Sequence, residues 1–181
     1  ETLVLGRAQL GRVPAVAMCV SNTYGPGDVA PTPHGSFVAA AALGKLPFTV
    51  RGMATESVGV VDAARALILA ADRGDIGRRY IVSERRIGLD EVIEIAARTG
   101  GRRPPRLVLP KPLMYVAGGL GSAATRLTGT PMRLQVSTVR LMHYMSAMDH
   151  SATSNDLDWQ PRPVDEAIAD GARYWLERAR S

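Results

Sequence analysis

Short apolar runs alternate with amphipathic segments along the first half of the chain. Residues 13–20 form an uncharged, β-leaning run, which predicts a strand buried on both faces of a parallel sheet. Further strands are expected at 48–50, 57–61, 79–82 and 106–109. Helices are expected at 1–11, 36–44, 62–72 and 89–99. Because strands alternate with helices, the pattern predicts an α/β fold with parallel strands.

The second half of the chain is mostly helical in its pattern. Helices are expected at 111–128, 133–145, 151–159 and 164–178. Three polar residues precede or open helical patterns and are expected to cap them: Ser36, Asp62 and Ser151.

The composition is that of an ordinary globular chain, because 46% of its 181 residues are apolar and 22% are charged. No apolar stretch of about 18 residues lacks a charge, which argues against a transmembrane span. The N-terminus lacks the basic and apolar regions of a signal peptide. The single cysteine, Cys19, excludes an internal disulfide and a cysteine-built zinc site, so the cytoplasm is the default location. The first residue is Glu1 rather than Met, which leaves open that the chain is a piece of something longer.

The net charge is +5, but the charges are unevenly placed. Residues 95–147 contain no acidic side chain. Their cations are Arg98, Arg102, Arg103, Arg106, Lys111, Arg126, Arg133 and Arg140. Such a block attracts phosphates, nucleic acid or anionic lipid, and the alternative is a solvated face. Only Tyr115 and Tyr144 are available in it for base stacking, which argues against nucleic acid.

Several motifs carry less weight. Residues 119–124 match G-x-G-x-x-A, but Gly129 follows too soon for a crossover helix, and close helix packing explains the small residues. The three histidines, His34, His143 and His150, fit no metal-binding spacing. His34 lies in a loop rich in glycine and proline and is a candidate to face a pocket.

The strongest candidate site directly follows the first predicted strand. Residues 19–28 read CVSNTYGPGD. In an open parallel sheet, ligands bind beyond the carboxyl ends of the strands. Ser21, Asn22 and Thr23 place polar groups there, followed by a loop able to wall a pocket. The alternative is a structural turn.

Four segments, in order, resemble the extended short-chain dehydrogenases, also called the NAD-dependent epimerase/dehydratase family. Residues 21–28 (SNTYGPGD) resemble the S-N-x-Y-G-P-G-D segment of that family, and residues 58–66 (VGVVDAARA) resemble its V-H-V-D-D-V-A-R-A. Residues 77–82 (GRRYIV) and 156–163 (DLDWQPRP) resemble its G-x-x-Y-x-x strand and its closing E-L-G-W-x-P-R-P motif. Residues 28–35 (DVAPTPHG) are most similar to the dihydroflavonol-reductase-like members.

The resemblance implies the C-terminal half of such an enzyme. Residues 1–94 would hold the last strands and helices of a Rossmann-type parallel sheet with a substrate loop, and residues 95–181 a smaller, mostly helical and basic substrate-binding part. The glycine-rich phosphate loop and the catalytic Tyr-x-x-x-Lys of the family have no counterpart here. They would lie in a missing N-terminal half of the same protein, so no catalytic residue is assigned and this chain alone is expected to be inactive.

The resemblance also implies a set of site residues. Val20, Ser21 and Asn22 would lie against the nicotinamide of NAD or NADP, most of which the missing half would bind. Thr23 and Tyr24 would face the substrate, with His34 as a further substrate residue. Several positions depart from the family: Val20 replaces a usual Pro, Gly59 a frequent His and Val61 a second Asp. Thr55 stands where sugar-nucleotide epimerases commonly carry an arginine, which favours a small apolar carbonyl or alcohol as the substrate.

The expected function is therefore that of the substrate-binding half of an NAD(P)-dependent oxidoreductase or epimerase. The alternative is a non-catalytic relative that binds or senses a ligand. An anionic membrane surface is a further candidate partner, with a peripheral location, because residues 112–125 are free of charge within the basic block. A half sheet would also leave an open strand edge and apolar face, so we expect the isolated chain to fold poorly or self-associate.

Overall fold

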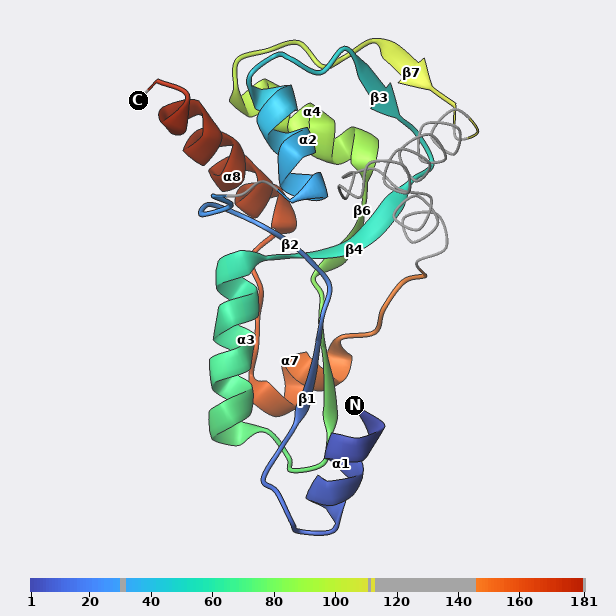
Figure 1. Ribbon diagram of the computed structural model, residues 1–181, viewed down its shortest axis with the longest axis vertical. Coiled ribbons are helices and arrows are strands. Elements are labelled where there is room, and N and C mark those ends of the chain that lie inside the picture. Colours follow the sequence, from blue (N-terminus) through green and yellow to red (C-terminus); the bar gives the residue numbers. More distant parts are fainter. Residues whose placement is uncertain (30–31, 111, 113–145, 181) are drawn as a thin grey trace, which may run out of the picture.

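The structure is a computed structural model that describes residues 1–29, 32–110, 112 and 146–180. The lower part of the molecule is a small parallel sheet with helices packed around it (Figure 1). β1 (Ala17–Val20) pairs in parallel with β5 (Arg79–Val82). The helices of this part are α1 (Thr2–Gln9), α3 (Val60–Arg73) and α7 (Ser151–Leu157).

The middle of the molecule joins this sheet to the upper part. β2 (Asn22–Tyr24) pairs in parallel with β4 (Ala54–Gly59), and β4 pairs antiparallel with β6 (Arg85–Gly88). Only Ser21 separates β1 from β2, so one extended segment changes partner from β5 to β4. Ser21 therefore lies at the carboxyl end of β1, at the point where pairing with β5 ends and pairing with β4 begins.

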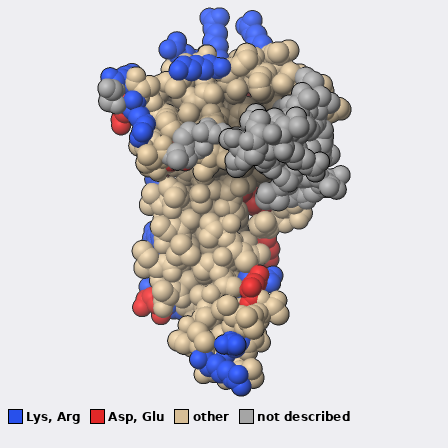
Figure 2. Space-filling model, in the orientation of Figure 1, with Lys and Arg blue, Asp and Glu red and all other residues tan. Residues whose placement is uncertain are grey.

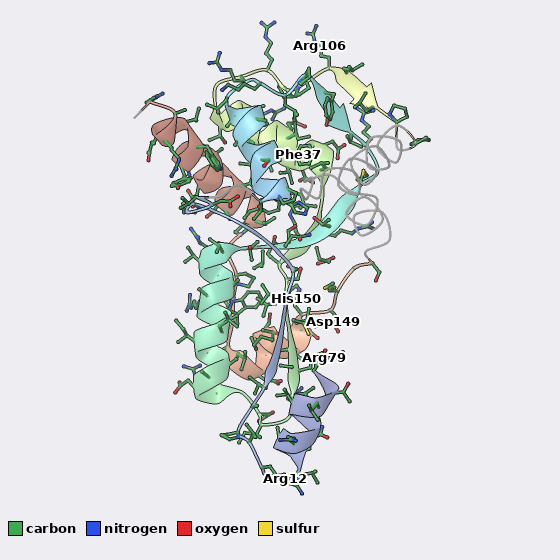
Figure 3. All side chains as sticks on the ribbon, in the orientation of Figure 1. Arg12, Phe37, Arg79, Arg106, Asp149 and His150 are labelled. Atoms are coloured by element: carbon green, nitrogen blue, oxygen red, sulfur yellow. The ribbon has the colours of Figure 1, made fainter. Side chains whose placement is uncertain are left out.

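Three helices dominate the upper part: α2 (Pro33–Ala42), α4 (Leu89–Thr99) and α8 (Val164–Arg178). They enclose an apolar core, against which Phe37 of α2 also packs (Figure 3). β3 (Phe48–Val50) and β7 (Leu107–Leu109) form a parallel pair at the same end.

Arg85 fixes the start of α8 relative to α4. Its guanidinium lies 2.8 Å from Glu91 of α4 and also donates to Asp165 in the first turn of α8. The hydrogen bond to Glu91 is the main reason that the pKa of Arg85 is raised. In addition, the backbone N–H of Val164 donates to Glu84 at 3.2 Å. These contacts hold α8 beside β2 and the loop that follows it.

The α/β fold with parallel strands is confirmed, and the elements predicted at 79–82, 89–99 and 164–178 have those bounds. The prediction of a strand at 13–20 buried on both faces is wrong. β1 begins only at Ala17, and Val20 is 39% exposed. The reason is that β1 pairs with β5 along one edge, while no strand among the described residues pairs with its other edge.

The predicted caps are wrong in detail. Thr32, rather than Ser36, caps α2 by accepting the N–H of Gly35 at 3.1 Å. Asp62 lies inside the first turn of α3, whose cap is Gly59. The N–H of Ser151 donates to Asp149 at 2.9 Å, so the carboxylate before α7 takes the role expected of the serine.

Besides β1, three strands were misplaced or not predicted. β2 was expected to be part of the segment that follows the first strand. The strand predicted at 57–61 lies at Ala54–Gly59, because α3 begins at Val60. β6 was not predicted, since its charged residues hide the apolar position of Ile87. The helices predicted at 111–128 and 133–145, the glycine motif at 119–124, and His143 lie outside the described residues, as does nearly all of the charge-free stretch 112–125.

On the face shown in Figure 2, basic side chains gather at the end of the molecule near β3 and β7, and others lie at the opposite end. The described members of the basic block are Arg98, Arg102, Arg103 and Arg106. Among the helices that the structure describes, none is long and apolar enough to cross a bilayer. The described histidine, cysteine and acidic residues likewise form no cluster that could hold a metal ion.

Candidate functional site

The predicted cofactor residues lie where the two sheet segments meet. The backbone N–H of Ser21 donates to the Val82 carbonyl at 3.0 Å, which extends the pairing of β1 with β5 by one residue. The Ser21 Oγ and the Asn22 Nδ2 are both buried, and neither has a hydrogen-bond partner. An unsatisfied buried polar atom costs about 1–3 kcal/mol, so two neighbouring ones mark a place where a ligand can supply the missing bonds.

Tyr24 and His34 form a pair beside this place. The Tyr24 hydroxyl lies 3.3 Å from His34 Nδ1, and the two rings meet edge to face at 6.0 Å. Tyr24 is only 4% exposed, and this burial raises its pKa, more than a hydrogen bond with the side chain of Thr55 lowers it. Tyr24 therefore keeps its proton at neutral pH and acts as a hydrogen-bonding group rather than as a base.

Burial also lowers the pKa of His34 below its ordinary value. The unfolded chain therefore takes up a proton near pH 6.5, whereas the folded chain does so only at lower pH. We expect stability to be complete above that pH and to fall as the pH drops towards the folded pKa. The melting temperature should fall between about pH 7.5 and about pH 5.5, and His34→Gln should make this fall smaller than in the unchanged protein. His150→Gln serves as the control. An unchanged pH profile in His34→Gln would contradict this assignment.

A narrow crevice lies next to the Tyr24–His34 pair. It is lined by those two residues together with Met53, Ala54, Thr55 and Leu89. Thr55 is buried, with its hydroxyl 3.4 Å from that of Ser57. Position 55, where a phosphate-binding arginine could stand, thus carries the small hydroxyl side chain of a threonine. No arginine or lysine is among the described residues that line the crevice.

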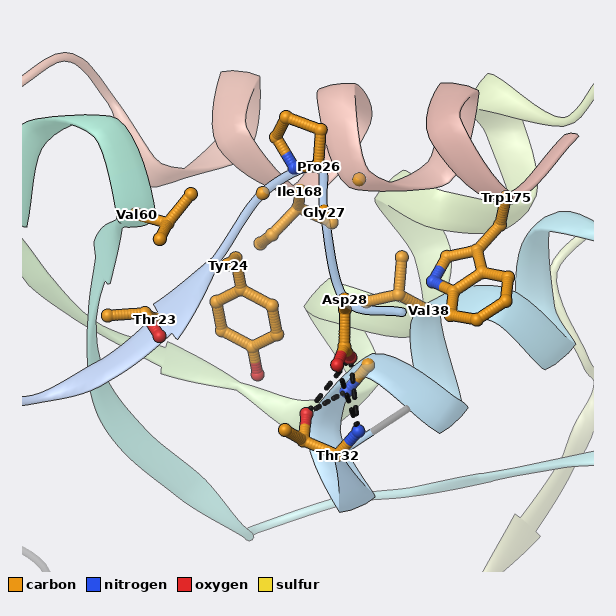
Figure 4. A pocket seen from close by; sticks show the side chains of 13 residues that line it. Thr23, Tyr24, Pro26, Gly27, Asp28, Thr32, Val38, Val60, Ile168 and Trp175 are labelled. Carbon is orange, nitrogen blue, oxygen red and sulfur yellow. Dashed lines mark hydrogen bonds between the residues drawn. The ribbon is translucent and has the colours of Figure 1, made fainter. Parts of the chain in front are cut away.

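A larger pocket of about 190 Å³ opens on the other side of the tyrosine ring, between the loop after β2, α2 and α8 (Figure 4). Its walls are mostly apolar, formed by Tyr24, Val38, Val60, Ile168 and Trp175. The exposed side chain of Thr23 also lines it. The pocket can therefore take a small apolar group with a polar edge.

The loop that closes this pocket is fixed at both ends. Asp28 accepts hydrogen bonds from the Thr32 backbone N–H, at 3.1 Å, and from the Thr32 hydroxyl, at 3.2 Å. At the other end, Gly25 has a φ of +150°, and a Cβ there would lie 2.4 Å from Val60. Gly171 of α8 approaches the same glycine, since a Cβ on Gly171 would lie 3.0 Å from the Gly25 carbonyl oxygen. A side chain at Gly171 would press on the loop from α8, and one at Gly25 would meet Val60 of α3.

The structure brings Asn22, Tyr24 and His34 together around β2, with Ser21 next to them. Thr23 points to the opposite face of the strand from its two neighbours. Val20 is exposed at the end of β1, where a bound group could rest on it. No observation tests the role of these six residues, so they stay predictions.

Sequence analysis missed a buried polar pair beneath the site. Ser83, directly after β5, donates to the Glu56 carboxylate of β4 at 2.5 Å. Glu56 is 2% exposed and Ser83 is fully buried. The run Thr55-Glu56-Ser57, which ends at the first residue of the strand predicted at 57–61, was a usable signal, because adjacent polar residues beside a buried strand require polar neighbours.

This chain is similar to known proteins over most of its length. The chain is 27% identical over 157 residues to a protein named sterol demethylase protein B from Methylococcus capsulatus, covering 85% of this chain and 47% of that protein. Among solved structures, gox2253 superposes with a TM-score of 0.77 at 26% identity, covering 99% of this chain and 54% of the other. A nucleoside-diphosphate-sugar epimerase from Pseudomonas aeruginosa superposes with a TM-score of 0.68 at 20% identity, and the match covers 97% of this chain and 52% of the other. No protein-family model matches the chain.

Other structures of the same fold contain a nicotinamide cofactor. RMD from Pseudomonas aeruginosa, complexed with NADPH, gives a TM-score of 0.66 at 14% identity and covers 98% of this chain and 53% of the other. A dTDP-glucose 4,6-dehydratase from Bacillus anthracis, in complex with NAD, superposes with a TM-score of 0.66 at 15% identity. The match covers 99% of this chain and 50% of the other. This chain spans about half the length of each relative. It therefore has the fold of about half of each of these structures, which include the nucleoside-diphosphate-sugar epimerase and the dTDP-glucose 4,6-dehydratase.

Proposed function

We propose that this chain is the substrate-binding half of an NAD- or NADP-dependent oxidoreductase or epimerase that acts on a small apolar carbonyl or alcohol. The observation that carries the proposal is the pair of buried, unpartnered polar atoms, Ser21 Oγ and Asn22 Nδ2, at the carboxyl end of β1. In relatives with this fold, NADPH or NAD is the bound cofactor.

The residues fit a nicotinamide carboxamide. The Asn22 Nδ2 donates hydrogen bonds and suits the carboxamide oxygen, while the Ser21 hydroxyl can donate or accept. The exposed Val20 side chain offers an apolar surface for the ring. When bound, the cofactor supplies hydride transfer. The residues of this chain hold one face of it and keep water away from that face.

The substrate class follows from the apolar surroundings of Tyr24. The phenol stays protonated, and His34 stays neutral at pH 7, so this wall offers hydrogen bonds without charge. Thr55 supplies no cation for a diphosphate, and the crevice beside it is lined by Met53 and Leu89. These features favour a small ligand with one oxygen function over a sugar nucleotide.

The proposal predicts opposite effects of one substitution on stability and on cofactor binding. Ser21→Ala removes an unpaired buried hydroxyl, so the natural protein that contains this chain should be equally or more stable without cofactor, by up to about 1 kcal/mol. The same change should weaken NADH or NADPH binding several-fold, and Asn22→Leu by about tenfold or more. Fluorescence titration of each reduced cofactor and thermal unfolding of the cofactor-free protein measure the two effects.

The matched control is Asn155→Leu, an exposed asparagine on α7. It should leave cofactor affinity unchanged. Equal affinities in Ser21→Ala, Asn22→Leu and the unchanged protein would remove these residues from the cofactor site. Failure of the unchanged protein to bind either cofactor would instead favour the non-catalytic relative.

A further inference from the structure

A second cavity of about 320 Å³ lies between the β3–β7 pair and α4. It shares no described lining residue with the pocket between β2, α2 and α8. Its lining includes Thr49 of β3 and Val108 of β7, together with Arg51, directly after β3, and Arg106, directly before β7. The proposed oxidoreductase function does not use this cavity.

The strand register places two of these residues side by side, because Thr49 lies opposite Val108 in the parallel pair. Arg51 directly follows β3 and Arg106 directly precedes β7, and both line the same cavity as Thr49 and Val108. The two arginines therefore stand at opposite ends of the strand pair, with Thr49 between them.

Thr49 is the buried polar group of this cavity. Its side chain is 8% exposed, and its hydroxyl has no hydrogen-bond partner. Valine has almost the same shape and would avoid the penalty of an unsatisfied buried hydroxyl. A hydroxyl that is buried, unpaired and open to a cavity is suited to bind a polar ligand atom.

The charge around the cavity favours an anion. Within the described part of the chain, neither Arg51 nor Arg106 has an ion-pair partner, and both side chains are exposed at the rim. Figure 3 shows Arg106 at this end of the molecule, where Figure 2 shows other basic side chains gathered. Of the two carboxylates from α4, Glu94 is held by Arg98 at 2.5 Å. Asp90 is then the one carboxylate in the described lining that no arginine neutralises.

We propose that this cavity binds a phosphate group, with Arg51 and Arg106 as its charged contacts and the Thr49 hydroxyl as its buried donor. Guanidinium groups match phosphate oxygens with paired hydrogen bonds. The phosphate can belong to a soluble phosphate ester or to the headgroup of an anionic lipid, and both present the same oxygens.

The test is calorimetric titration of inorganic phosphate and of glycerol 3-phosphate into the natural protein that contains this chain. Arg51→Gln should weaken binding about tenfold or more, and Thr49→Val several-fold with no loss of melting temperature. Arg103→Gln is the matched control, because Arg103 is exposed in the same basic segment but does not line the cavity. A phosphate site elsewhere in the protein would not respond to Thr49→Val.

The source of the phosphate is distinguished by sedimentation with vesicles of phosphatidylcholine, with and without phosphatidic acid. Binding to the acidic vesicles that Arg51→Gln abolishes indicates a lipid headgroup. Binding of glycerol 3-phosphate without vesicle binding indicates a soluble ester. The proposal is overturned if phosphate does not bind, or if Arg51→Gln, Thr49→Val and Arg103→Gln behave alike, since that pattern reflects surface charge alone.

Discussion

Replacing Trp159 with alanine should destabilise the protein by about 3–5 kcal/mol, which is a large part of the stability of an ordinary domain. Trp159 is fully buried in the core between α3, β5 and α7. Its indole N–H donates to the Asp62 carbonyl at 2.9 Å, and its ring meets that of His150 edge to face. The substitution leaves a cavity and removes this additional hydrogen bond to a carbonyl of α3. Denaturant unfolding of the natural protein measures the loss.

The control is Trp159→Phe, which keeps most of the ring volume and removes the N–H. It should cost about 0.5–1.5 kcal/mol, the range for one lost hydrogen bond, because the Asp62 carbonyl still lies within the hydrogen-bonded helix α3. The difference between the two variants separates packing from hydrogen bonding. If Trp159→Ala lowered the free energy of unfolding by less than Trp159→Phe does, the packing described for this core would be wrong.

The isolated 181-residue chain should self-associate or aggregate. α3 carries a stripe of exposed apolar side chains, which includes Val61 at 56% exposed and Ile68 at 70%. Val60 and Leu67 of the same helix are also exposed. An exposed apolar patch of this kind marks a surface that another domain or another protein covers. One edge of β1 pairs with no strand among the described residues, and an exposed strand edge also favours association.

Two lysines on that stripe should reduce the association. In the isolated chain, Val61→Lys combined with Ile68→Lys should weaken self-association at least about tenfold, measured by analytical ultracentrifugation. Ile76→Lys changes an exposed apolar residue outside α3 and should have little effect. A sharp, cooperative melt of the unchanged chain as a monomer would contradict the prediction.

The sequence predicted the helices with strong periodicity best. The helix at 89–99 places Leu89, Val92, Ile93 and Ala96 on one face, and all four are buried in the structure. Strand bounds were less accurate, because burial of a strand depends on neighbours that the local pattern does not contain. β1 reads as a strand buried on both faces, but its residues are only partly buried, and no strand among the described residues pairs with one of its edges.

The candidate site was predictable only in part. The run Ser21-Asn22-Thr23-Tyr24 was singled out from its place after a strand and from its family resemblance. The contact of Tyr24 with Thr55 and the pair Glu56–Ser83 join residues that lie far apart in the chain, so no spacing rule could show them. The cavity at Thr49 likewise depends on the register of β3 with β7.

The most direct test of the central claim is the intact mass of the protein in its native source, detected through this chain. The account predicts a species of roughly twice the 19.3 kDa of these residues, as a complete two-part nucleotide-binding enzyme requires. The added sequence should contain a glycine-rich phosphate loop and a Tyr-x-x-x-Lys. A native species of 19.3 kDa would contradict the claim, because such a chain has neither element and could not carry out dehydrogenase chemistry.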